Sequence, residues 1–60
     1  MYEVRVHSDN GPDLTYEATT LASARRMASE ELQDGARKVE VVGPDGRVVD
    51  EYLADDEWVA

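Results

Sequence analysis

The residues best suited to chemistry are few in this 60-residue chain. His7 is the only histidine and cysteine is absent, so nucleophilic catalysis would have to use the neighbouring Ser8. Adjacent side chains of an extended chain point to opposite faces, which keeps the Ser8 hydroxyl away from the His7 ring. We therefore predict that His7 is a solvent-facing strand residue, that no residue is catalytic and that the protein is not an enzyme.

Two other patterns could in principle bind a metal ion or a phosphate group. Asp55, Asp56 and Glu57 are consecutive carboxylates, but three adjacent side chains cannot converge on one ion as the spaced ligands of a calcium loop do. The four glycines stand at expected turns, and none belongs to a phosphate-binding motif that opens a helix. The sequence therefore predicts no metal site and no cofactor.

The net charge of the chain indicates which classes of partner it attracts and which it repels. Fourteen acidic residues against six basic ones give a formal net charge of −8. This charge disfavours direct contact with nucleic acid or anionic lipid and favours a protein partner with a basic surface. No stretch approaches the roughly 20 apolar residues of a membrane span, and the lack of cysteine fits a cytoplasmic location. An alternative is that the acidity only keeps a small chain soluble.

The first half of the chain predicts a hairpin followed by a helix. Residues 1–7 and 14–19 alternate apolar and polar side chains, and residues 8–13 between them contain the turn formers Asn, Gly and Pro. From residue 20 the apolar period lengthens to about 3.6, which indicates an amphipathic helix. Thr19 or Thr20 is its expected N-cap, and Gly35 is expected just past its end. The expected buried stripe is Leu21, Ala24, Ala28 and Leu32, flanked by Met27.

Residues 37–53 predict a second hairpin. The turn sequence Gly43-Pro44-Asp45-Gly46 places proline at its second position and glycine where a bulged turn needs positive φ. A regular register then pairs Val41 with Val49, Val39 with Glu51, Val42 with Val48 and Glu40 with Asp50. The side expected to pack on the helix carries Val39, Val41, Val49 and Leu53. The opposite side carries a smaller apolar patch of Val42, Val48 and Tyr52.

These elements define one domain over residues 1–60, with residues 54–60 as an acidic C-terminal segment. The expected fold class is α+β, with the order β-β-α-β-β. Its sheet has four strands, antiparallel or mixed, packed on one helix, and a fifth strand near Trp58 is an alternative. The order of the strands within the sheet does not follow from the sequence. Trp58 and Val59 either cover a sheet face, or Trp58 is an anchor for a partner pocket.

A family resemblance rests on the helical stretch 17–29, Glu-Ala-Thr-Thr-Leu-Ala-Ser-Ala-Arg-Arg-Met-Ala-Ser, together with the flanking hairpins and the final Trp58-Val59. This pattern resembles small phage-encoded proteins that include anti-CRISPR proteins of the type I inhibitor group. The resemblance implies a sheet packed on one helix and a stoichiometric, non-catalytic inhibitor of a Cas surveillance complex, acting in the host cytoplasm. Residues 31–35 lack the family's aromatic-Gly-Thr signature, and no contact residue is carried over.

The sequence thus predicts a non-catalytic acidic interaction protein, phage or mobile-element encoded. Its partner would be a basic, nucleic-acid-binding surface such as that of a Cas effector complex, which it would occlude. The predicted partner-binding residues are Glu40, Asp50, Glu51, Tyr52, Asp55, Asp56, Glu57 and Trp58. The alternative is a structural or assembly module that homodimerises through its sheet.

Overall fold

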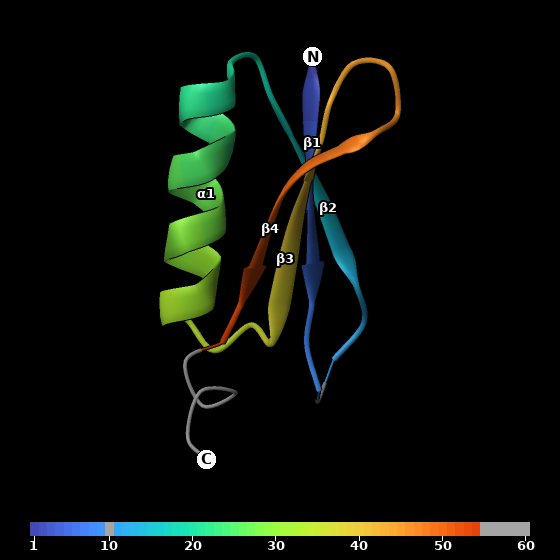
Figure 1. Cartoon of the computed structure of the whole chain (residues 1–60). Coiled ribbons are helices and arrows are strands. Elements are labelled where there is room, and N and C mark those ends of the chain that lie inside the picture. The colour runs from blue at the N-terminus through green and yellow to red at the C-terminus, as the bar shows by residue number, and fades with distance from the viewer. Residues whose placement is uncertain (10, 55–60) are drawn as a thin grey trace.

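The chain folds as one four-stranded antiparallel sheet with one helix against it (Figure 1). The computed structural model describes residues 1–9 and 11–54. The elements are β1 (Tyr2–His7), β2 (Leu14–Ala18), α1 (Leu21–Gln33), β3 (Lys38–Val42) and β4 (Val48–Leu53). The predicted α+β class and β-β-α-β-β order are confirmed. The fifth strand considered near Trp58 lies outside the described residues.

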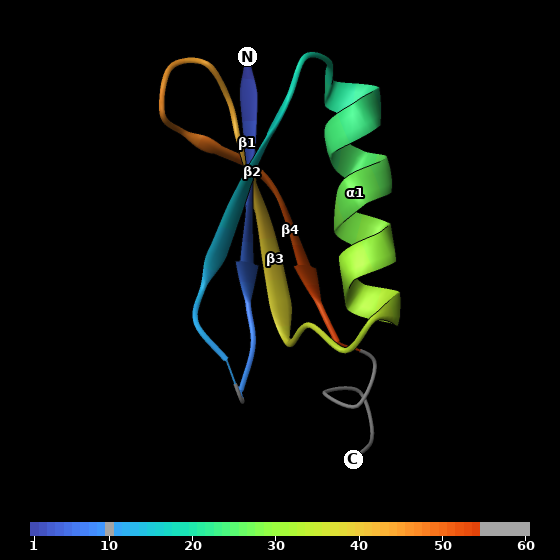
Figure 2. The same ribbon diagram turned by 180° about the vertical axis from the view of Figure 1, so that it is seen from behind.

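The sheet order is β2-β1-β3-β4, which places the first strand at the centre. Val4 of β1 lies opposite Tyr16 of β2 on one side and opposite Val41 of β3 on the other. The connection from β2 through α1 to β3 therefore passes over β1. Figures 1 and 2 show α1 along one face of the sheet, and no described element covers the other face. We call this second face the open face.

The helix begins and ends where the sequence predicts. The Thr20 hydroxyl accepts a hydrogen bond from the Ser23 amide at 3.1 Å, as an N-cap does. Past the other end, Gly35 has a φ of +106°. The Gly35 amide donates to Leu32 at 3.2 Å and the Ala36 amide to Glu31 at 3.0 Å, which closes the helix with a Schellman motif. With 13 residues, α1 is too short to cross a membrane, and the described residues contain no other helix that could.

The core consists of small side chains. Ala24 and Ala28 of α1 are fully buried, as the predicted stripe requires, and they let the helix approach the valines of β1 and β3 closely. The buried cluster comprises Val4, Val6, Ala18, Ala24, Ala28, Ala36, Val39 and Val41, bordered by Tyr2, Leu21, Met27, Leu32 and Tyr52. Within residues 1–9 and 11–54 no side chain larger than valine is buried, so this core depends on close packing of small side chains.

The β3–β4 turn forms as predicted, but the strands below it pair differently. The Gly43 amide donates to the Arg47 carbonyl at 2.7 Å, and Gly46 has a φ of +86°. The ladder starts with Val42 opposite Val48, as expected, and then a β-bulge shifts the register. The observed partners are Val41 with Asp50, Glu40 with Glu51, Val39 with Tyr52 and Lys38 with Leu53. The predicted pairings of Val41 with Val49, Val39 with Glu51 and Glu40 with Asp50 are therefore wrong.

Because of the bulge, the β4 side chains that face the helix are not the predicted ones. Val49 is the extra residue, so Asp50 and Tyr52 turn toward α1, where Tyr52 packs on the core. Val49 and Leu53 were expected to pack on the helix, but the side chains of Val49 and Leu53 are each about half exposed. Leu53 lies opposite Lys38, on the face of the sheet away from the helix. The predicted patch of Val42, Val48 and Tyr52 is wrong too, because Tyr52 lies on the other face and Val42 is buried.

Candidate functional site

The open face of the sheet carries charges of both signs in register. Arg5 of β1 lies opposite Glu40 of β3, and Glu40 lies opposite Glu51 of β4. The ammonium group of Lys38 lies 3.2 Å from a Glu51 carboxylate oxygen and 3.8 Å from one of Glu40. Its hydrogen bond to Glu51, together with the negative charges of Glu51 and Glu40, raises the pKa of Lys38 above its ordinary value. The two strand carboxylates are therefore bridged by one base.

His7 lies on this open face, as expected for the outer side of β1, but its side chain is only 33% exposed. Its Nε2 atom lies 3.0 Å from Glu40 Oε1 and its Nδ1 atom 3.1 Å from Asp13 Oδ2. Only the imidazolium form carries N–H groups on both nitrogens and donates to both carboxylates. Since each nitrogen contacts a carboxylate, neither is directed at a hydroxyl such as that of Ser8. The arrangement links β1, β3 and the β1–β2 loop.

The structure brings some of the predicted partner-binding residues together and separates others. Glu40 and Glu51 lie side by side on the open face. Asp50 lies on the helix side, where Oδ2 accepts a hydrogen bond from Arg25 Nε at 2.8 Å. This hydrogen bond and the Asp50 charge raise the pKa of Arg25. Tyr52 shares that side and borders the core. Asp55, Asp56, Glu57 and Trp58 lie outside the described residues.

A second group of carboxylates lies at the C-terminal end of α1. Glu30, Glu31 and Asp34 occupy or follow the last turn, which contains no basic residue. None of the three forms an ion pair with any residue that the structure describes. They add to the negative end of the helix dipole instead of compensating it, which concentrates negative potential at this end of the molecule. We call these three residues the acidic helix end.

The acidic helix end lies at the same end of the molecule as the last residues of β4 (Figures 1 and 2). The Ala54 amide donates to the Arg37 carbonyl at 3.0 Å, which holds the end of β4 beside the segment that follows α1. The acidic sequence 55–57 continues directly from Ala54. The three carboxylates in and just after the last helical turn are visible in the sequence. Their position beside the end of β4 follows only from the strand order, and the predicted partner-binding set does not include them.

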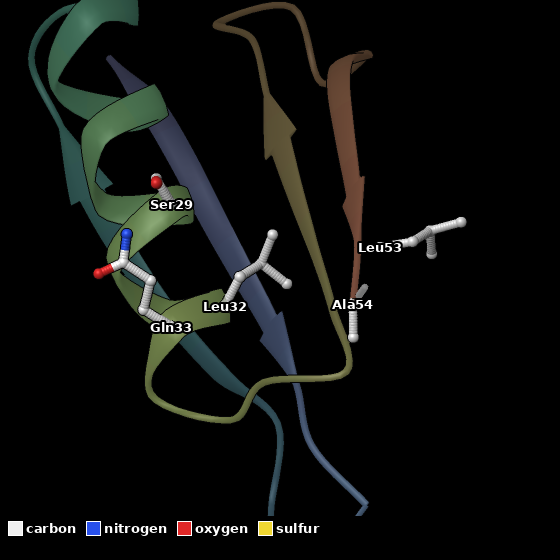
Figure 3. A pocket seen from close by; sticks show the side chains of 5 residues that line it. All are labelled: Ser29, Leu32, Gln33, Leu53 and Ala54. Carbon is white, nitrogen blue, oxygen red and sulfur yellow. The ribbon is translucent and has the colours of Figure 1, made fainter. Parts of the chain in front are cut away.

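A shallow hollow of about 340 Å³ separates the end of α1 from the end of β4 (Figure 3). It is lined by Ser29, Leu32, Gln33, Leu53 and Ala54. In Figure 3, Leu32 points from the helix toward the sheet, whereas Leu53 points away from the helix. None of these described lining side chains is acidic or basic, so they supply no general acid or base. His7 is not among its lining residues.

Within residues 1–9 and 11–54, no group of three or more His, Cys, Asp or Glu side chains is arranged to hold a metal ion. Fold and charges together define a small acidic α+β domain with a mixed-charge sheet face and an acidic helix end. Comparison with protein-family models, with curated proteins and with solved structures finds no match to this chain.

Proposed function

We propose that this chain is a non-catalytic acidic interaction protein that binds and occludes a basic, nucleic-acid-binding surface. In its specific form the proposal is an anti-CRISPR-like inhibitor, phage or mobile-element encoded, that binds a type I Cas surveillance complex in the host cytoplasm. The resemblance of residues 17–29 and the surrounding hairpins to such inhibitors motivates the choice of partner.

The observation that carries the proposal is the distribution of ion pairs. Among the described residues, five of the six bases form an ion pair with a carboxylate of the same chain, namely Arg5, Arg25, Arg37, Lys38 and Arg47. Arg26 on α1 forms none with a described residue, so one base and the three carboxylates of the acidic helix end remain outside these ion pairs. The excess negative charge is available to a partner.

The location of this charge gives the proposed interface. The acidic helix end adjoins the end of β4, from which Asp55, Asp56 and Glu57 continue in sequence. A basic groove that binds the phosphate backbone of DNA would be attracted to this end by long-range electrostatics. An occupied groove cannot bind DNA, so inhibition requires no reaction and is stoichiometric.

The test is displacement of labelled target DNA from a purified type I surveillance complex. The variant Glu30→Gln/Glu31→Gln/Asp34→Asn removes the acidic helix end and also relieves its conflict with the helix dipole, so the fold is expected to persist. The control Glu3→Gln/Glu17→Gln/Asp45→Asn removes the same charge elsewhere. Wild type and control are expected to displace DNA near one equivalent, while the helix-end variant needs about tenfold more.

Failure of the wild-type chain to displace DNA at a large excess would contradict the inhibitor proposal. An equal loss of DNA displacement in the helix-end variant and the control would show that net charge matters and that the acidic helix end has no special role. Tight association of the chain itself with bare DNA would contradict the electrostatic basis of the proposal, because like charges repel.

A further inference from the structure

The sheet ends on two outer strands, β2 and β4, each paired on one side only among the described residues. The free side of an outer strand presents backbone N–H and C=O groups that can pair with another strand. Proteins commonly protect such edges with charged side chains, prolines or bulges. The two edges of this sheet differ in that protection.

The β4 edge is protected. The bulge at Val49 interrupts the regular ladder, and the adjacent carboxylates of Asp50 and Glu51 stand in the middle of the strand. In an antiparallel self-pairing centred on these residues, carboxylates of the two copies lie opposite each other, which is unfavourable. A second copy is therefore disfavoured at this edge.

The β2 edge lacks this protection. Its five residues pair with β1 in an uninterrupted register, with no proline and no bulge, and Glu17 is their only charged residue. Two apolar side chains on the helix side of the strand remain accessible, because β2 diverges from α1 toward its first residues (Figures 1 and 2). Leu14 is 44% exposed and Tyr16 is 37% exposed.

We propose that a second copy of this chain pairs with the β2 edge, antiparallel and about a two-fold axis at Tyr16. The two sheets then become one continuous eight-stranded sheet. In this register Tyr16 lies opposite Tyr16 of the second copy, Leu14 opposite Ala18 and Thr15 opposite Glu17. The exposed Leu14 and Tyr16 side chains of both copies meet on the helix side, and no carboxylate faces another. This proposal is independent of the proposed function.

Size and charge set the strength of this dimer. One short strand per copy gives a contact at the low end of the size range of specific interfaces, so the dimer is weak. Two copies of net charge −8 also repel each other over a Debye length. Added salt screens that repulsion, so self-association strengthens as the salt concentration rises. Binding to a basic partner, by contrast, weakens under the same change.

The experiment is sedimentation equilibrium of the full chain up to about 1 mM, at about 0.05 M and 0.5 M NaCl. The wild-type chain is expected to dimerise reversibly, more strongly at the higher salt. Tyr16→Glu places two carboxylates opposite each other and is expected to weaken the dimer by about tenfold. The control Val49→Glu makes the same charge change at the β4 edge and is expected to weaken the dimer much less, through net charge alone.

A gain-of-association variant guards against misfolding as an explanation. Thr15→Lys places an ammonium group opposite Glu17 of the second copy at two symmetric positions and is expected to tighten the dimer by about fivefold at low salt. The new lysine also lies opposite Arg5 of its own chain, so circular dichroism of the variant must match the wild type. Val49→Lys makes the same change of net charge at the other edge and is expected to tighten it less. A wild-type chain that stays monomeric throughout would overturn the proposal. So would disruption by Val49→Glu equal to that by Tyr16→Glu.

Discussion

The guanidinium of Arg25 and the carboxylate of Asp50 lie 2.8 Å apart and connect the helix to the outer strand β4. Arg25 projects from the exposed side of α1, and Asp50 reaches it only because the bulge turns Asp50 toward the helix. The contact therefore depends on the register of β4 and reports on it directly.

A double-mutant cycle of Arg25→Gln and Asp50→Asn tests this contact. Because Arg25 is exposed, each single variant is expected to lower Tm by about 5 °C or less. The double variant should lower Tm by less than the sum of the two, since the single variants remove the same interaction. Strict additivity, measured by thermal unfolding, would argue against the contact and against the observed register.

Deletion of Val49 tests the bulge itself. Val49 is the extra residue of the β4 ladder, so its removal leaves Val48 opposite Val42 and Asp50 opposite Val41. The shortened chain is therefore expected to fold, with a loss of about 1 kcal/mol or less and with the coupling between Arg25 and Asp50 preserved. If β4 paired regularly, the same deletion would move residues 50–53 to the opposite face, and unfolding would be severe.

These two predictions concern the part of the fold that sequence reasoning misplaced. The order Val-Val-Asp-Glu-Tyr-Leu of β4 puts a carboxylate and apolar residues on each face in either register, so alternation alone cannot choose. The choice depends on Tyr52 bordering the core and Asp50 reaching Arg25, which are contacts with distant parts of the chain. The central place of β1 is likewise a tertiary property.

The helix ends and the β3–β4 turn, by contrast, could be predicted from short stretches of sequence. The Thr20 hydroxyl accepts a hydrogen bond from the first helical turn, as a threonine does at the N-cap of a helix in any fold. Gly35 adopts positive φ because it has no side chain to oppose that conformation. The Gly43–Gly46 turn was predictable for the same reason. Of the candidate site, the excess of carboxylates was visible in composition. The clustering of the acidic helix end beside the end of β4 required the folded chain.

Because buried alanines of α1 pack on the sheet, enlarging a buried alanine and enlarging an exposed one should affect the unfolding free energy very differently. Ala28 is fully buried against the sheet, so Ala28→Leu overpacks the core and is expected to lower the unfolding free energy by about 2 kcal/mol. Ala22 is exposed on the same helix, and Ala22→Leu is expected to change it by about 0.5 kcal/mol or less. Denaturant titration of both variants makes the comparison, and equal effects would contradict the orientation of α1.

The raised pKa of Lys38 predicts a loss of stability at alkaline pH. A base whose folded-state pKa lies above its unfolded value stabilises the protein fully below the unfolded value, here about 10.5, and loses that contribution as the pH rises through the folded pKa. The difference in Tm between wild type and Lys38→Gln is expected to be constant from about pH 7 to 9 and to shrink above about pH 11.

Lys38→Arg is the control for that measurement. Arginine stays charged over this range, so its advantage over Lys38→Gln should persist where that of lysine fades. A wild-type advantage that does not change with pH would contradict the role of the contacts from Lys38 to Glu51 and Glu40.

We propose that this small domain binds a basic surface through its negative charge. The most direct test of this binding is the affinity of the wild-type chain for a type I surveillance complex as a function of salt. We predict that the dissociation constant rises at least about tenfold between about 0.05 M and 0.5 M NaCl, because added ions screen the attraction. An affinity that stays flat over this range would contradict the claim.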